Sequence, residues 1–281
     1  MLSAWRDIAV FVDETEAGDQ IARQAAVVAR QHQSHLVGIF GVAREPSHPS
    51  EGFTRGEQGI RDLIAKRRHE DAVRALAAGR QFSDLLRDYD VGTEFRVVRR
   101  GETAYDVVLN GLNCDLIVVS HPKLDHLPES WSGEHLLLVT GAPVLRIPRA
   151  WDDRPVGKNV LIAWNGSREV RRAVNDSMPL LGSADTVTVL TVDGDRTPEL
   201  IGSTADDVLR HLSRHDVDAH VASIQSEGRP VAEAILGHAA SISADLLVIG
   251  AYSHPRTMER LFGGITRSLL NDAAIPLLLS R

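Results

Sequence analysis

The feature that most constrains the fold of this chain is an internal repeat. Residues 114–133 (CDLIVVSHPKLDHLPESWSG) align without a gap onto residues 244–263 (ADLLVIGAYSHPRTMERLFG), at a constant offset of 130. Each copy begins with a short apolar run, which is typical of a strand buried on both faces, and continues through a polar loop. Two copies of one pattern in 281 residues predict two similar domains.

The rest of the chain repeats this alternation of short apolar runs and amphipathic segments. We expect strands over residues 8–12, 36–42, 94–98, 116–119 and 144–147, and again over 160–164, 187–192, 219–224, 246–249 and 276–280. Helices are expected over 17–33, 57–87, 102–112, 205–212 and 230–242, with Gly79 a candidate interruption, and another is capped by Ser167. This order predicts an α/β fold of two tandem, open, mainly parallel five-stranded sheets flanked by helices.

A change of composition separates the two copies. Residues 148–157 (PRAWDDRPVG) carry two prolines and several charges between apolar runs, as expected of a domain boundary. We therefore place the first domain at residues 1–150 and the second at 156–281.

Charge and cysteine content exclude several classes of protein. The net charge of −7 argues against binding nucleic acid or an anionic membrane. The single cysteine, Cys114, excludes an internal disulfide. Neither an export signal nor an apolar run of about 18 residues is present, so the expected location is the cytoplasm, with no membrane partner.

Residues 245–267 combine the features of an anion-binding site. The strand ends at Gly250, a polar loop with His254, Arg256 and Arg260 follows, and a helix begins at Gly263 and Gly264. Glycines allow close approach to a ligand, and free N–H groups at a helix start favour phosphate. Thr266 adds a hydroxyl donor in the first turn. The basic side chains fit either phosphate contacts or a solvated loop.

This segment resembles the signature of the universal stress protein family: G-x-x-G, nine residues, then Gly followed by Ser or Thr. Gly250 and Gly263 match it, Ser253 stands in place of the second glycine, and Gly264 stands in place of the hydroxyl residue. The resemblance extends over nearly the whole chain as two copies. It implies a Rossmann-like fold of the adenine nucleotide alpha-hydrolase type, in a family where many members bind ATP or AMP and others bind no nucleotide.

The resemblance also implies where adenosine would lie. The family places an Asp at the end of its first strand, and here Asn165 keeps a hydrogen-bonding side chain without the charge. Val192 would offer backbone groups to adenine, and Ala163 and Ile265 complete the implied contact set. In an open parallel sheet these positions share the carboxyl edge. Asn165 can equally serve only the turn and cap before the next helix.

The two anion loops are not equivalent. Lys123 faces Ser253, Glu134 faces Gly264, and Leu136 stands where the second half has Thr266. A carboxylate at a helix start occupies the place that a phosphate would take, and repels one. We therefore expect a nucleotide site in the second half only.

Catalytic and metal-binding patterns are lacking in the sequence. It contains no P-loop, no G-x-G-x-x-G after a strand, no nucleophile elbow and no S-G-G-x-D-S loop of the related ATP-cleaving hydrolases. His211 and His215 have helical spacing but no obvious third ligand, so no metal site is expected. We expect no enzymatic role beyond slow, incidental ATP hydrolysis.

The function expected from the sequence is stress response or regulation through an adenine nucleotide, ATP or AMP, with Mg²⁺. The alternative is a nucleotide-free dimerisation or scaffolding protein of the same fold. Residues 144–147 and 276–280 end their halves as short apolar strands. An unpaired apolar edge invites aggregation and must be covered. The family resemblance implies that these strands meet in an intramolecular pseudo-dimer, and we expect the chain to form a homodimer.

Overall fold

The structure of the chain is a computed structural model. It describes residues 4–42, 56–99, 112–125, 127, 131–151, 154–193, 198–251 and 264–281.

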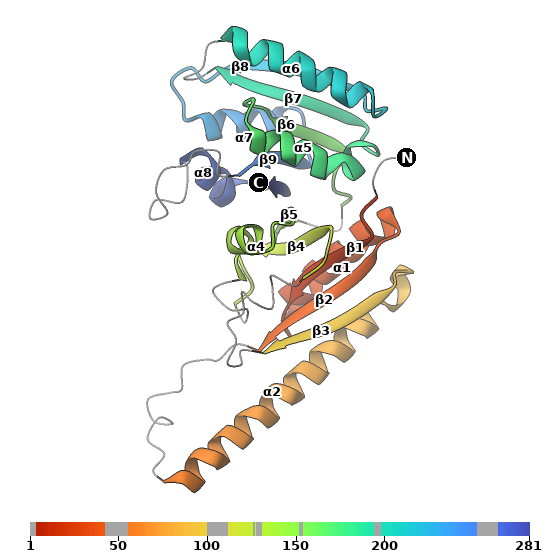
Figure 1. Cartoon of the computed structure of the whole chain (residues 1–281), viewed down its shortest axis with the longest axis vertical. Helices are drawn as coiled ribbons and strands as arrows, with labels where there is room; N and C mark the ends of the chain where they lie inside the picture. Colours follow the sequence, from red (N-terminus) through yellow and green to blue (C-terminus); the bar gives the residue numbers. More distant parts are fainter. Residues whose placement is uncertain are drawn as a thin grey trace.

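Within these residues the chain forms one ten-stranded sheet with the order β3-β2-β1-β4-β5-β10-β9-β6-β7-β8 (Figure 1). The first half supplies β1 (Asp7–Val12), β2 (His35–Val42), β3 (Thr93–Arg99), β4 (Leu116–His121) and β5 (Val144–Pro148). The second half supplies β6 (Asn159–Ala163), β7 (Thr186–Asp193), β8 (Ala219–Gln225), β9 (Leu246–Gly250) and β10 (Leu277–Ser280). Within each half all described pairs are parallel, which confirms the predicted α/β fold with a mostly parallel open sheet.

Helices pack against this sheet, and three of them begin after residues that are typical helix caps. They are α1 (Glu16–His32), α2 (Glu57–Leu86), α4 (Gly133–Thr140), α5 (Arg168–Leu181), α6 (Pro198–Ser213), α7 (Val231–Ser241) and α8 (Gly264–Asp272), and a 3-10 turn, η1 (Arg87–Tyr89), follows α2. The hydroxyl oxygens of Thr15, Ser132 and Ser167 each accept a bond from a backbone N–H in the first turn of α1, α4 and α5.

The halves join edge to edge through β5 and β10, the only antiparallel pair among the described strands. Leu145 lies opposite Leu278, with Arg146 opposite Leu277 and Val144 opposite Leu279. The prediction that the two end strands meet is thereby confirmed. This pairing joins the two five-stranded sheets into one ten-stranded sheet and satisfies the backbone groups of both edges.

The pairing register of β5 and β10 shows which residues of the two halves are equivalent, residue by residue, where the sequence alignment alone does not. Val144 pairs with Ile117 in the first half, and Leu277 pairs with Leu247 in the second. Since residues 117 and 247 are equivalent in the repeat, Val144 corresponds to Leu277. Arg146 then corresponds to Leu279, and the local pseudo-twofold axis passes through the Leu145–Leu278 pair.

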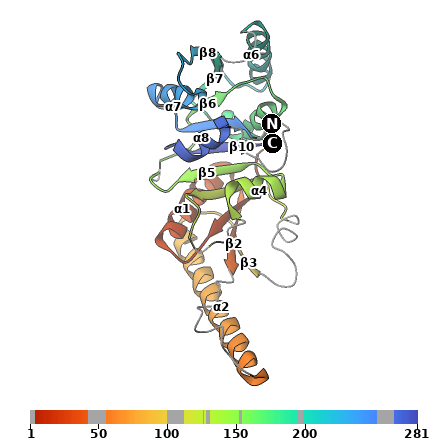
Figure 2. The ribbon, with the colours of Figure 1, turned by 90° about the vertical axis from the view of Figure 1, so that its left-hand side faces the viewer.

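Helix lengths differ from the prediction in two places. α2 continues through Gly79, because the absent side chain leaves room for the Phe95 ring, whose Cδ1 lies 3.1 Å from where a Cβ would be. α6 begins at Pro198 rather than at 205. The helix predicted over 102–112 lies outside the described residues except for its last residue. In Figures 1 and 2 the long α2 projects beyond the sheet.

Candidate functional site

The carboxyl ends of β9, β6 and β7 form one edge in the second half. β6 lies between the other two strands, with Ile162 opposite Val248 and Ala163 opposite Leu190. The strand ends at Ala163, Val192 and Gly250 therefore lie side by side. Three of the positions predicted from the sequence are brought together by the parallel order of the sheet.

Asn165 shapes the turn that leads from this edge into α5. Its Oδ1 accepts a hydrogen bond from the Ser167 backbone N–H at 3.0 Å, and Gly166 has a φ of 68°. Ser167 Oγ then accepts from the Val170 N–H at 3.3 Å, which confirms the predicted N-cap. Asn165 is exposed at the sheet edge. Its turn role is therefore established, and its predicted contact with adenosine stays a prediction.

Gly250 has a packing role that the sequence did not indicate. A Cβ at this position would lie 2.3 Å from the Val170 backbone N and 2.5 Å from the Glu169 backbone C. The start of α5 therefore occupies the space that a side chain at Gly250 would need. The close approach that requires glycine here is to a helix of the same half, whereas the sequence suggested an approach to a ligand.

The described residues leave the start of α8 open. None of their heavy atoms lies within 4 Å of a Cβ built on Gly264, Ile265 is 48% exposed, and Thr266 is half-buried. The first turn of α8 contains no acidic residue. Ser253 and Gly263 lie outside the described residues, as do His254, Arg256 and Arg260.

A buried carboxylate at this edge was missed in the sequence. Glu169 is 3% exposed and accepts a hydrogen bond from Arg168 Nε at 2.5 Å, while the Arg168 side chain is 81% exposed. Burial opposes ionisation of Glu169, but hydrogen bonds from Arg168 and Ser167 outweigh it and lower the pKa of the carboxyl. An acidic residue in the first turn of a helix is an ordinary pattern, so no local signal marked it.

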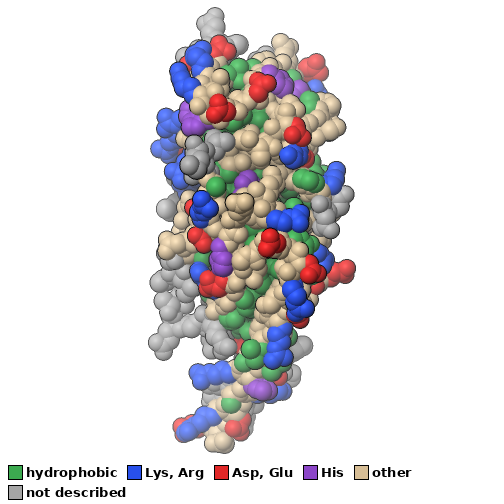
Figure 3. Space-filling view, turned by 90° about the vertical axis from the view of Figure 1, so that its right-hand side faces the viewer, with side chains coloured by type: hydrophobic (Ala, Val, Ile, Leu, Met, Phe, Trp, Pro, Cys, Tyr) green, Lys and Arg blue, Asp and Glu red, His purple; other side chains and the backbone are tan. Residues whose placement is uncertain are grey.

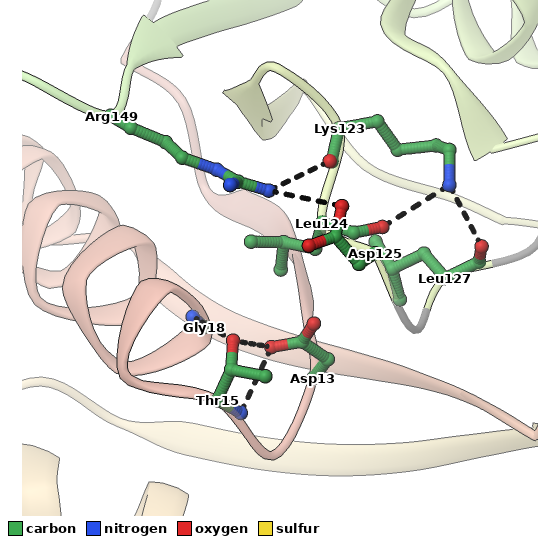
Figure 4. A network of polar contacts seen from close by, with 8 residues as sticks. All are labelled: Asp13, Thr15, Gly18, Lys123, Leu124, Asp125, Leu127 and Arg149. Atoms are coloured by element: carbon green, nitrogen blue, oxygen red, sulfur yellow. Dashed lines mark hydrogen bonds and ion pairs between the residues drawn. The ribbon is translucent and has the colours of Figure 1, made fainter.

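The corresponding edge of the first half carries Asp13, at the end of β1. Asp13 is 5% exposed, its Oδ1 accepts from the N–H and hydroxyl of Thr15 at 3.1 and 2.5 Å, and its Oδ2 has no hydrogen-bond partner (Figure 4). Asp13 follows the first strand of its half as Asn165 does in the second half. This equivalence was available in the sequence, and sequence reasoning did not use it.

The first-half edge is otherwise tied together by the chain itself. Lys123 Nζ donates to the carbonyl oxygens of Leu124 and Leu127 at 3.1 and 2.9 Å, and Arg149 donates to the Lys123 carbonyl at 2.9 Å (Figure 4). Gln20 in turn donates to the Arg149 carbonyl at 2.8 Å. These bonds hold the linker and the loop after β4 against α1.

The start of α4 differs from that of α8 as the sequence predicted. Glu134 lies in the first turn of α4, and Leu136, at the place of Thr266, is fully buried. The first-half helix start therefore already holds a carboxylate, and the position equivalent to Thr266 carries no hydroxyl.

Of the two residues considered for a metal site, His211 lies in the last turn of α6 and His215 in the turn that follows it. The rings of His211 and His215 are 4.7 Å apart, and His211 Nε2 lies 3.2 Å from Asn175 Oδ1. Among the described residues, no group of three potential metal-binding side chains was found. The expected absence of a metal stays a prediction.

The surface shows no segregation of charge on the face that is drawn, and the helices have no membrane-spanning character in the described ranges. On the face drawn in Figure 3, acidic and basic side chains are interspersed. No helix in the described ranges combines the length and apolar character that crossing a bilayer requires.

Comparisons with known proteins bear on the whole fold and on the second half. A universal stress protein of Archaeoglobus fulgidus superposes with a TM-score of 0.65 at 14% identity, over 98% of this chain and 96% of that one. A Pseudomonas aeruginosa protein classified provisionally in the same family gives 0.60 at 19% identity, over 99% and 93%. At such identities the likeness shows a shared fold. No curated protein matches the chain significantly.

The sequence profile of the universal stress protein family matches residues 157–281. That range contains the complete second half, from the residues before β6 to the end of β10. Residues 157–281 are therefore identified as a universal stress protein domain, and the whole chain shares the fold of solved universal stress proteins.

Proposed function

We propose that the second half binds one adenine nucleotide, ATP or AMP, with Mg²⁺ accompanying the triphosphate, and that the chain acts in a cytoplasmic stress response or its regulation. The observation that carries this proposal is the open, acid-free start of α8 beside the carboxyl edge of β9, β6 and β7.

The phosphate end of the ligand is assigned to the first turn of α8. The leading N–H groups of a helix lack intrahelical partners, and the helix dipole favours an anion there. The open space over Gly264 leaves these groups approachable, and the Thr266 hydroxyl is a further donor. At the start of α4, by contrast, Glu134 would repel a phosphate.

The adenosine end is assigned to the neighbouring strand ends. Asn165 is exposed beside Ala163, and backbone groups near Val192 lie on the adjacent strand. An amide side chain can both donate and accept hydrogen bonds, as a ribose hydroxyl or an adenine edge requires.

We infer a binding role without designed catalysis. The proposal assigns no general base and no nucleophile to the ligand, so ATP hydrolysis would be slow and incidental. The nucleotide would act as a ligand that favours one state of the protein, which partners then recognise.

A nucleotide-free scaffold is the second candidate, and the packing at Gly250 favours it. Because the missing side chain of Gly250 is explained by α5, this glycine no longer counts as support for a ligand. In that case the output would be self-association, such as a homodimer.

Calorimetric titration of the full chain with Mg-ATP and with AMP tests the proposal. Gly264→Glu copies the first-half residue into open space, and a carboxylate about 4 Å from a phosphate costs about 4 kcal/mol, or roughly a thousandfold in Kd. Gly237→Glu is the matched control, since Gly237 is exposed on α7 and also has open space. Asp13→Asn tests the first half.

We expect one site per chain, lost in Gly264→Glu and retained in Gly237→Glu and Asp13→Asn. Two equal sites, or a loss confined to Asp13→Asn, would overturn the assignment to the second half. Absence of binding to the unaltered chain, together with a concentration-dependent dimer in sedimentation, would favour the scaffold.

A further inference from the structure

Arg146 is a buried cation at the seam between the two halves. It lies in β5, opposite Val119 of β4 on one side and Leu277 of β10 on the other, and is 2% exposed. Within the described part of the chain, none of its three guanidinium nitrogens has a hydrogen-bond partner. Arginine offers five N–H donors, and buried charges in proteins are ordinarily paired.

The neighbours of Arg146 across the strands are apolar. Val119 and Leu277 point to the same face of the sheet as Arg146, because residues directly opposite in neighbouring strands share a face. α4 covers this face, since a Cβ on Gly133 would meet the side chains of Val119 and Val144. The pseudo-twofold equivalent of Arg146 is Leu279, so the second half places an apolar residue in the same position.

The positive charge of Arg146 is only partly compensated by the nearest negative charge. Burial lowers the pKa of Arg146 to about 10, and the Glu134 carboxylate opposes this from a distance. No ion pair within 4.0 Å joins Arg146 to any acidic residue in the described part of the chain. At neutral pH the guanidinium is therefore charged and without a direct counterion, which is costly in a folded protein.

A second basic side chain lies close by on the same face. His121, at the end of β4, follows Val119 by two residues and is therefore on its side of the sheet. Burial and then the charge of Arg146 lower the pKa of its imidazole, and the ring is hydrogen-bonded to the Asn271 backbone of α8. His121 thus brings a helix of the second half against the strand that neighbours Arg146.

We propose that this seam is a binding site for a small oxyanion, a single phosphate or carboxylate group, held by the Arg146 guanidinium with His121 beside it. A planar guanidinium pairs with such groups through two parallel hydrogen bonds. The site draws on both halves and is separate from the open start of α8. Since the guanidinium nitrogens are covered, the anion enters when α4 or α8 moves away from the sheet.

Equilibrium dialysis of the full chain against labelled inorganic phosphate, and separately against labelled acetate, tests this at constant ionic strength in chloride buffer. Arg146→Leu removes the cation and introduces the residue that the second half already carries as Leu279. Arg229→Leu is the matched control, because Arg229 is exposed and only weakly paired with Glu227 at 3.3 Å. Glu134→Gln removes the opposing carboxylate.

We expect one site per chain for at least one of the two anions, at least tenfold weaker in Arg146→Leu and unchanged in Arg229→Leu. Glu134→Gln should tighten binding severalfold, which a purely structural role for Arg146 would not produce. Binding of phosphate without acetate would identify a phosphate site, whereas binding of both anions would show that a carboxylate is recognised as well. Binding of both anions weaker than about 1 mM, or binding that persists in Arg146→Leu, would overturn the proposal. So would loss of the site in Gly264→Glu, since the anion would then belong to the nucleotide site.

Discussion

Replacing Arg146 with leucine should stabilise the ligand-free protein. Burial lowers the pKa of Arg146 to about 10, more than two pKa units below its ordinary value. At about 1.4 kcal/mol per pKa unit, the folded state carries this charge at a cost of about 3 kcal/mol. Leucine removes the charge and adds apolar contacts with Val119 and Leu277, its neighbours across the strands. In other proteins, replacing buried ionic groups with well-packed apolar ones raises the free energy of unfolding by about 1 to 4 kcal/mol.

Urea unfolding in chloride buffer is the direct assay. We expect Arg146→Leu to raise the free energy of unfolding by about 2 kcal/mol with an unchanged m-value, and the midpoint temperature by roughly 4 to 8 °C. Arg229→Leu, at an exposed site, should stay within about 0.5 kcal/mol of the unaltered chain. A clear loss of stability in Arg146→Leu would refute the reasoning, because it would mean that the guanidinium makes favourable contacts that its surroundings do not show.

Three further predictions concern other sites. Gly250→Ala should lower the free energy of unfolding in urea by about 2 kcal/mol or more, because its Cβ would meet the Val170 backbone at 2.3 Å. Gly264→Ala, in open space, should lower it by less than about 1 kcal/mol. Equal effects would contradict the packing role of Gly250. Burial lowers the pKa of His32 to about 4, so the unfolded chain binds more protons than the folded chain between pH 6.5 and 4. The free energy of unfolding should therefore fall by up to about 2 kcal/mol as the pH is lowered from 6.5 to 4. His32→Gln should flatten this part of the curve of stability against pH, and an unchanged slope would count against the argument. Burial raises the pKa of the Cys114 thiol to about 12, so iodoacetamide at pH 8 should label the native chain roughly a thousandfold more slowly than the urea-unfolded chain, as mass spectrometry would show; comparable rates would disprove the burial argument.

The elements of the fold could be predicted because their signals are local. A strand buried on both faces must be apolar along its length, so runs such as Leu246–Gly250 were found within a residue or two of their true ends. The cap at Ser167 was recognised because a hydroxyl immediately before an amphipathic segment has one common role. The extension of α6 back to Pro198 was missed, since polar residues at its start carry no clear periodicity.

The candidate site was predictable in part. Parallel strands place their carboxyl ends on one edge, so Ala163, Val192 and Gly250 had to lie together once the sheet was inferred. The retained Asp13 was within reach of the same reasoning, because it ends the first strand of its own half. Its uncompensated Oδ2, in contrast, depends on burial that no local pattern reports.

By itself, the sequence determined the repeat, the alternation of strands and helices, the edge on which Ala163, Val192 and Gly250 lie, and the difference between Glu134 and Gly264. Only the tertiary structure decided what Gly250 and Arg146 do. Gly250 is explained by the backbone of Val170, 80 residues earlier, and Arg146 by Leu277, 131 residues later. In the sequence one is a glycine after a strand and the other an arginine within a strand. Their energetic roles arise from the space and charge that distant segments leave around them, and those quantities exist only once the chain has folded.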